Sequence, residues 1–237
     1  MKRSILVFVF TTIFSVGGIS QTPPADADPV LQGTASYKMP QSAIDAEIYG
    51  KVVMAIHIDK SGKPTKASLA AGPMWPCGKN PVAALNSLSS ALSDAMLLLR
   101  FFPAIKGGKP MATDVNLELT LKNPNLDRGP PEKDPVTGKP IQRIISGGVL
   151  NGKATSLPIP AYPAEAKIAR VGGVVPVQVL FDEKGYVIRA GATGGHPLLQ
   201  LSARQSACGA KFKPVTLQGE PIKVSGLITY NFDASRL

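Results

Sequence analysis

Cysteine and histidine are both scarce in this chain, whose 237 residues include two of each. Neither His57 nor His196 is followed by a second ligand at the spacing of a zinc site. The Gly-x-Ser-x-Gly turn of serine hydrolases and the glycine-rich loop that binds phosphate are also missing. These absences favour a protein that is not an enzyme and that has no catalytic residue, no metal ligand and no cofactor.

Long apolar runs are missing too, because none reaches the roughly 20 residues that cross a bilayer as a helix. The longest, Ile5 to Ile19, follows Lys2 and Arg3 and precedes the small residues of a cleavage site ending at Ser20. This pattern predicts a signal peptide at residues 1–20 and hence export. An uncleaved segment that anchors the protein in the inner membrane is the alternative.

Acidic residues are fewer than basic ones, 16 against 26. Without Lys2 and Arg3 of the signal, 24 basic residues remain against 16 acidic ones, a formal charge of +8. A basic surface suits nucleic acid, but export argues against that partner. The charge favours anionic envelope surfaces or acidic peptides, and a merely solvated basic face is the alternative.

Residues 162–232 contain the pattern of one complete small domain. A short helix is expected around Ala166, because the preceding proline suits a helical first turn. Alternating apolar residues then predict two strands joined by a turn at 182–185. Helical spacing returns from Leu198 to Ala210, and a closing strand at 222–232 has one apolar face and one polar face.

The order and spacing of these motifs over about seventy residues resemble the C-terminal domain of the TonB energy-transducer family. The residues that carry the resemblance, and that we expect to define the fold, are Tyr162, Pro163, Gly173, Asp182, Gly185, Phe212, Pro214 and Gly219. The resemblance implies an α+β domain that binds peptide segments of outer-membrane transporters by adding a strand to a sheet edge. Within it, we expect Phe212 to fill the core and Pro214 to end the helix.

An earlier stretch repeats part of this pattern. Gly50 corresponds to Gly173 at an offset of 123 residues, whereas Phe101 corresponds to Phe212 at an offset of 111. The difference of 12 residues predicts an insertion in the earlier copy, within 72–81. We therefore expect two tandem small TonB-C-like domains of α+β class, each a short antiparallel sheet with a packed helix.

The expected organisation follows from these two copies and from the proline content between them. The proline-rich stretch before residue 144 is too polar to fold alone and is expected to be an extended linker. A short additional strand or hairpin is expected within 141–160. The predicted parts are a signal peptide at 1–20, an extended lead-in at 21–40, a divergent copy at 41–122, a linker at 123–143 and the C-terminal domain at 144–237.

The two cysteines lie in different copies. Cys77 is in the insertion of the first copy, and Cys208 is on the expected helix of the second. Export permits a disulfide, so a bond between the copies and a buried free Cys208 are both open.

The closing strand is the expected binding edge. An exposed edge presents unpaired backbone N–H and C=O groups, which an extended peptide can satisfy. The inward residues Ile222, Val224, Tyr230 and Phe232 are expected to belong to the core. Peptide contacts are expected on the backbone and on the outward residues Lys223, Ser225, Leu227, Thr229 and Asn231.

The resemblance implies a function in TonB-dependent transmembrane transport, with peptides of outer-membrane transporters as partners. An uncleaved first segment would add the inner-membrane motor proteins, although it lacks the histidine of the family's motor-engaging helix. We expect an exported protein of the periplasm or cell envelope. The alternative is a structural or adaptor envelope protein whose domains pair or homodimerise through the same sheet edges, without energy transduction.

Overall fold

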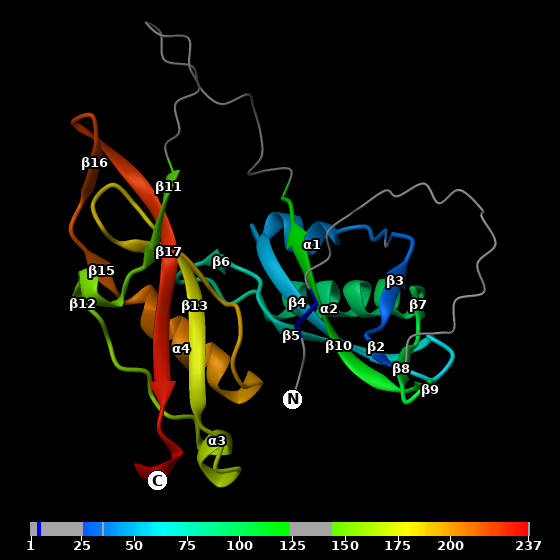
Figure 1. Ribbon diagram of the computed structural model, residues 1–237. Coiled ribbons are helices and arrows are strands. Elements are labelled where there is room, and N and C mark those ends of the chain that lie inside the picture. The colour runs from blue at the N-terminus through cyan, green and yellow to red at the C-terminus, as the bar shows by residue number, and fades with distance from the viewer. Residues whose placement is uncertain (1–3, 6–25, 35, 124–143, 237) are drawn as a thin grey trace, which may run out of the picture. The chain divides into compact units, whose positions relative to one another are not determined.

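The computed structural model describes residues 4–5, 26–34, 36–123 and 144–236, and Figure 1 shows its helices and strands. Most of the expected signal peptide and linker lie outside the described residues. By internal contacts the chain divides into two compact units. One comprises Met1–Pro40, Val53–Leu69 and Asn86–Leu119, and the other comprises Gln41–Val52, Ala70–Leu85 and Thr120–Leu237. The domain boundaries expected from the sequence stay a prediction.

The second unit is built on a sheet of six strands. Its main path runs in the order β11 (Ile144–Val149), β17 (Glu220–Phe232), β13 (Gly173–Phe181), β14 (Val187–Ala192) and β6 (Trp75–Pro76), and β16 (Val215–Leu217) pairs with β17. All of these pairs are antiparallel except β11 with β17, which is parallel. The α+β class is thus confirmed, and the expected purely antiparallel sheet is corrected to a mixed one.

Helices cover one face of this sheet. The chain enters β13 through α3 (Ala164–Ile168), and α4 (Pro197–Cys208) packs on β13 and β14 (Figure 1). The short elements are η1 (Asn151–Lys153), β12 (Ala154–Ser156) paired with β15 (Lys211–Phe212), and η2 (Ala234–Arg236). The extra strand expected within 141–160 is therefore present as β11 and β12, which pair with different strands and not with each other.

The core lies between the sheet and α4. Alternate residues of β13 and one face of α4 are buried because their periods of two and 3.6 point them at each other. Phe212 is buried as expected and stacks on Phe181, with ring centroids 4.6 Å apart. Tyr162 meets Phe232 edge to face at 5.4 Å and donates to the carbonyl of Val171 at 2.6 Å. These contacts give Tyr162 and Phe212, two residues of the pattern found in the sequence, a structural role.

The turn between β13 and β14 depends on Asp182 and Gly185. The Asp182 carboxylate accepts from the N–H groups of Lys184 at 3.0 Å and Tyr186 at 2.8 Å. Gly185 has φ +86°, and its carbonyl accepts from the N–H of Phe212 at 2.9 Å. A Cβ at Gly185 would lie 2.0 Å from the Phe212 carbonyl oxygen, so this close approach requires glycine.

Pro214 does not end α4, contrary to the expectation. The helix ends at Cys208, and Gly209 caps it by donating its N–H to the carbonyl of Ser206 at 3.0 Å. A Cβ at Gly209 would lie 3.1 Å from the ring of Pro158, so the small residue lets the chain turn there. Pro214 stands between β15 and β16.

A second sheet has four strands, three of them from residues 50–121 and one from Ser4–Ile5. Its order is β1 (Ser4–Ile5), β10 (Thr113–Leu121), β4 (Gly50–Ile58) and β5 (Pro64–Ala71). Two helices lie before and within this stretch, α1 (Gln41–Asp45) and α2 (Val82–Leu97), and Leu88, Leu92 and Met96 form a buried apolar face of α2. Smaller sheets join β2 (Asp26–Ala27), β8 (Ala104–Lys106) and β9 (Lys109–Met111), and join β3 (Val30–Gln32) with β7 (Arg100–Phe102).

The turn after β4 has the same hydrogen bonds as the turn after β13. The Asp59 carboxylate accepts from the N–H groups of Ser61 at 2.8 Å and Lys63 at 3.0 Å. Gly62 has φ +82°, and its carbonyl accepts from the N–H of Phe101 at 2.9 Å. These positions match Asp182, Gly185 and Phe212 at the two offsets found in the sequence.

In the described part of the chain, no helix is long and apolar enough to span a membrane.

Replacing Gly185 by alanine is expected to lower the free energy of unfolding by more than about 3 kcal/mol, because both φ and the Phe212 carbonyl oppose a Cβ. Gly219→Ala is the matched control: φ there is +90° and no atom lies within 4 Å of the added Cβ. It should cost only the strain of a left-handed residue, about 1–2 kcal/mol. Urea unfolding of both variants measures the difference, and equal costs would contradict the close approach.

Candidate functional site

The five residues predicted to contact peptide share the outward face of β17. Lys223, Ser225, Leu227 and Thr229 are half-buried, and Asn231 is exposed. The inward residues Ile222, Val224, Tyr230 and Phe232 are buried, as expected for the core. The alternation of the closing strand therefore assigns both faces correctly.

β17 is not a free edge over much of its length. β11 lies beside it in parallel register, with Ser146 opposite Ser225 and Val149 opposite Leu227. The expectation that the closing strand forms the sheet edge is therefore wrong for Lys223–Leu227. Sequence spacing does not reveal this neighbour, because a strand containing Gly147-Gly148 has little pattern to specify its partner. Peptide contact by the five outward residues stays a prediction.

Asn151 pairs with β17 at Thr229, beyond the end of β11. Its side-chain amide donates to the Thr229 carbonyl at 2.7 Å and accepts from the Thr229 N–H at 2.9 Å. The N–H of Leu150 donates to the carbonyl of Leu227 at 2.8 Å. The side chain of Asn151 thus satisfies both backbone groups of Thr229, as a neighbouring strand would.

Leu150 anchors this segment in the core. It is only 2% exposed, and its side chain occupies the place above Gly226, where a Cβ would lie 2.5 Å from Leu150 Cδ1. Gly226 stands on the inward face between Val224 and Ile228, so the missing side chain makes room for Leu150. Burying a leucine contributes about 1.5–3 kcal/mol.

A cavity of about 750 Å³ adjoins β11 on the same side. Phe181, Phe212 and Val224 supply apolar lining, and Lys153 and Lys213 stand among the polar lining residues. Lys153 donates to the carbonyl of Gly147 at 3.3 Å, which ties the lysine to β11. The cavity can accept an apolar side chain with an acidic neighbour.

β6 covers the opposite edge of the sheet. It pairs antiparallel with β14, placing Pro76 opposite Arg189 and Trp75 opposite Ala190. The N–H of Cys77 continues the pairing by donating to the carbonyl of Ile188 at 2.9 Å. β6 lies within 72–81, where the sequence predicts an insertion, and it forms the last strand of the sheet of the second unit.

A disulfide joins this insertion to α4. Cys77 and Cys208 are bonded, with an S–S distance of 2.06 Å. The structure thus decides between the two alternatives that the sequence leaves open. The sequence positions of the two cysteines could not decide between a disulfide and a free Cys208, because the bond depends on how residues 72–81 fold against β14.

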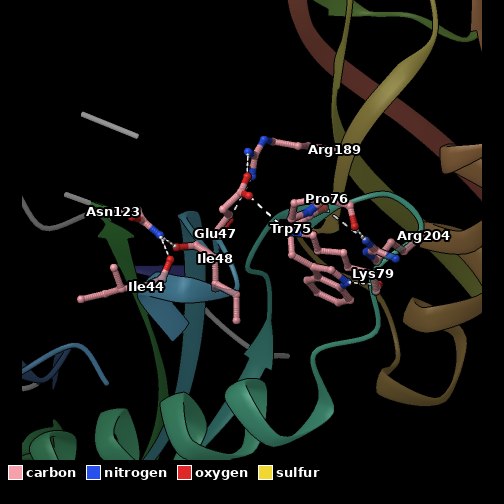
Figure 2. A network of polar contacts seen from close by, with 9 residues as sticks. All are labelled: Ile44, Glu47, Ile48, Trp75, Pro76, Lys79, Asn123, Arg189 and Arg204. Atoms are coloured by element: carbon pink, nitrogen blue, oxygen red, sulfur yellow. Dashed lines mark hydrogen bonds and ion pairs between the residues drawn. The ribbon is translucent and has the colours of Figure 1, made fainter. Parts of the chain in front are cut away.

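Arg204 holds the same insertion through polar contacts (Figure 2). It is 5% exposed and donates to three carbonyls, those of Ala190 at 3.1 Å, Trp75 at 3.1 Å and Pro76 at 3.0 Å. Its guanidinium lies over the Trp75 ring, 3.8 Å from the centroid. Burial lowers the pKa of Arg204 to about 10, which leaves it charged at neutral pH. The carbonyls and the ring take the place of water around this charge.

Glu47 links two cations on this side of the unit (Figure 2). Its carboxylate forms ion pairs with Arg189 and, at 3.2 Å, with Lys79. Arg189 also donates to the Glu47 carbonyl at 3.0 Å. Hydrogen bonds from Arg189 and then Lys79 lower the pKa of Glu47, outweighing the opposing effect of burial.

Asn123, which follows β10, is hydrogen-bonded to the segment that contains α1. Its amide donates to the carbonyls of Ile44 at 3.0 Å and Ile48 at 3.2 Å (Figure 2). Asn123 is 1% exposed, so these bonds satisfy a buried polar group.

A second cavity, of about 870 Å³, opens on the outward face of the C-terminal sheet. Lys223 and Ser225, two of the predicted contact residues, line it. Lys51, Lys122 and Arg189 also line it, Arg189 as the ion-pair partner of Glu47, and none of the described lining residues is acidic.

The histidines hold local structure. His196 precedes α4 and caps it, because its ring Nδ1 accepts from the N–H of Leu198 at 3.3 Å. Exposed His57 lies 2.8 Å from the carboxylate of Asp114. Among the described residues, no group of three or more His, Cys, Asp or Glu residues could hold a metal ion.

Sequence reasoning missed the residues that cover the two edges. These are Trp75, Leu150, Asn151, Arg189 and Arg204. The single tryptophan beside a cysteine was a usable signal, and so was an arginine next to the apolar face of the expected helix. Leu150 and Asn151 gave no comparable signal, because Asn-Gly is typical of a turn.

Comparison with known proteins gives one result for the C-terminal part. Residues 158–234 match the family model described as Gram-negative bacterial TonB protein C-terminal. The match supports the C-terminal copy expected from the sequence and covers all of α3, β13, β14, α4 and β15 to β17. No curated protein and no solved structure matches the chain.

Removing the disulfide is expected to destabilise the second unit. A Cys77→Ser, Cys208→Ser double variant should lose about 2–5 kcal/mol, because the bond closes a loop of 131 residues. Urea unfolding measures the loss. The wild-type chain in a dithiol reductant is the control and should unfold at the same midpoint as the variant. An unchanged midpoint in both would show that the bond does not form.

The ion pairs of Glu47 predict a pH dependence. Because the folded-state pKa is lowered, this stabilisation is present above the ordinary value of 4.5 and is lost as the pH falls through the lower folded value. The stability difference between wild type and Glu47→Gln should therefore shrink between about pH 6 and about pH 3. Glu220→Gln, at an exposed carboxylate, is the control. A difference that stays constant with pH would contradict the pairing.

Proposed function

We propose that this chain is a non-enzymatic, TonB-like protein of the cell envelope that binds peptide segments of outer-membrane, TonB-dependent transporters. The peptide adds as a strand to the β17 edge of the C-terminal sheet. The family match at residues 158–234 supports the relation to TonB-dependent transport. Strand addition, and the choice of the β17 edge for it, are inferred from the backbone groups at the sheet edges.

The observation that carries the proposal is the parallel pairing of β11 with β17. An edge strand binds an extended segment through alternate backbone N–H and C=O groups, whatever the source of that segment. β11 supplies an example within the chain, so the β17 edge has the geometry that strand addition requires. The other edge is less suitable, because the disulfide between Cys77, the residue after β6, and Cys208 ties this cover covalently to α4.

We also propose that residues 41–122 are a divergent copy of the same domain. The support is the recurrence of the aspartate turn, the left-handed glycine and the phenylalanine N–H at matching positions. In this interpretation the first copy contributes β6 to the second. Its role is to support the C-terminal sheet.

Export follows from the predicted signal peptide and places the protein in the periplasm. A retained N-terminal segment would instead hold it in the inner membrane, within reach of the motor proteins. Both locations let the C-terminal sheet meet transporter peptides on the periplasmic side.

A structural or adaptor role is the second candidate. The observation that favours it is that segments of this chain already cover both sheet edges. A protein with covered edges avoids uncontrolled strand pairing and can serve as a stable envelope component or pair with a second copy. Such a protein would bind no transporter peptide.

The test is binding of fluorescent peptides from the periplasmic N-termini of outer-membrane transporters to the full chain, measured by anisotropy. Backbone methylation at alternate residues distinguishes strand addition from side-chain recognition. Methyl groups on amides that face β17 should weaken binding about tenfold each, and those on the other set should have little effect. Scrambled peptides are the control. Failure of every transporter peptide, together with concentration-dependent dimerisation, would favour the structural role.

A further inference from the structure

We propose that β11 is a resident strand in the peptide site, and that a partner peptide binds by taking its place on β17. This inference rests on the proposed function, since it names the regulation of that site and the peptides that fit it. The site would then be closed in the free protein and open only to peptides that compete with β11.

The extent of the family match supports this view. Residues 158–234 include β13, β14, α4 and β17, whereas β11 ends at Val149. The matched domain therefore has its helix and its three central strands without β11. In this chain, β11 is an addition that covers the edge of β17.

The two edge covers are attached in different ways. β6 is held by the Cys77–Cys208 disulfide and by the buried Arg204. β11 has no covalent bond to its neighbour, because these two cysteines are the only ones in the chain. This segment is held by backbone pairing, by the Asn151 amide, by the Lys153 hydrogen bond to Gly147, and by packing of Ile145 and Leu150 on the core. A peptide from another chain can make each of these noncovalent contacts in place of β11.

The pairing of β11 is also irregular. Its register shifts between Ser146 and Val149, and Gly148 within that interval has φ +64°. The Val149 side chain is 63% exposed. A regular strand without the two glycines would pair along its whole length and lose less conformational entropy. The more favourable pairing of such a partner strand offsets the high effective concentration that β11 has as part of the same chain.

The contacts of the resident strand define the ligand. The notch at Gly226 accepts a branched aliphatic residue such as Leu150, and Thr229 pairs with an amide side chain such as that of Asn151. Lys153 and Lys213 beside the adjoining cavity favour an acidic residue nearby. Leu150 has helical backbone angles and Asn151 begins η1, so these two contacts come from a turn at the end of the strand. The preferred ligand is therefore a strand that ends in such a turn, with an aliphatic residue followed by Asn in the turn, flanked by Asp or Glu.

The test uses a fluorescent peptide with the sequence of residues 144–152, IISGGVLNG, and the full-length chain. Leu150→Ala removes the side chain that packs above Gly226, and Asn151→Ala removes the two hydrogen bonds to Thr229. The peptide keeps both groups. Each variant should bind the peptide about tenfold or more tightly than wild type, because the site is free for a larger fraction of the time. Ile159→Ala, at a residue that is 93% exposed and lies outside β11 and β17, should bind as wild type does.

Amide hydrogen exchange provides the second measurement. When the peptide binds, the amides of 144–149 should lose protection while those of β13 keep it. Protection of β13 also shows that Leu150→Ala remains folded, and Asn151→Ala repeats the test without changing the core. Equal or weaker peptide binding by both variants, or retained protection of β11 in the complex, would overturn the proposal.

Transporter peptides separate this inference from the proposed function. If they bind wild type while β11 stays protected, strand exchange is wrong and peptide binding stands. If the 144–152 peptide exchanges with β11 but no transporter peptide binds any variant, exchange stands and the proposed partner is wrong.

Discussion

Backbone groups at the edges of a sheet need partners, and this requirement governs the second unit. The strands β17, β13 and β14 leave two edges, and each edge is satisfied by a segment from outside the matched domain. β11 pairs in parallel with one, and β6 pairs antiparallel with the other. Arg204 and the disulfide hold β6, and Leu150 and Asn151 hold β11.

The two segments are held by different physical means. The β6 side uses a disulfide, a buried guanidinium on three carbonyls and a tryptophan ring, so its release requires reduction as well as the exposure of a charge. The β11 side uses a leucine in a glycine notch and one amide side chain. The difference leaves β6 attached covalently and β11 attached through noncovalent contacts alone.

The interior of the C-terminal domain was largely predictable from the sequence. Alternation along 175–181 and 222–232, and helical spacing at 198–210, identified the buried residues because each regular element has its own period. The aspartate and glycine of the 182–185 turn were also recognisable, since a left-handed residue and a side-chain acceptor leave a local signature. Pro214 was misassigned because Gly209 ends the helix first, and either residue is typical of a helix end.

The sequence by itself determined the elements, their buried faces and the two matching turns, because those depend on neighbours a few residues apart. Only the tertiary structure decided which strands lie side by side, since pairing between segments such as 75–76 and 189–190 depends on contacts more than a hundred residues apart. For the same reason it decided that Cys77 bonds Cys208, that Leu150 fills the place above Gly226, and that β17 is covered. The candidate site lies at an edge, and an edge is defined by what does or does not lie beside it.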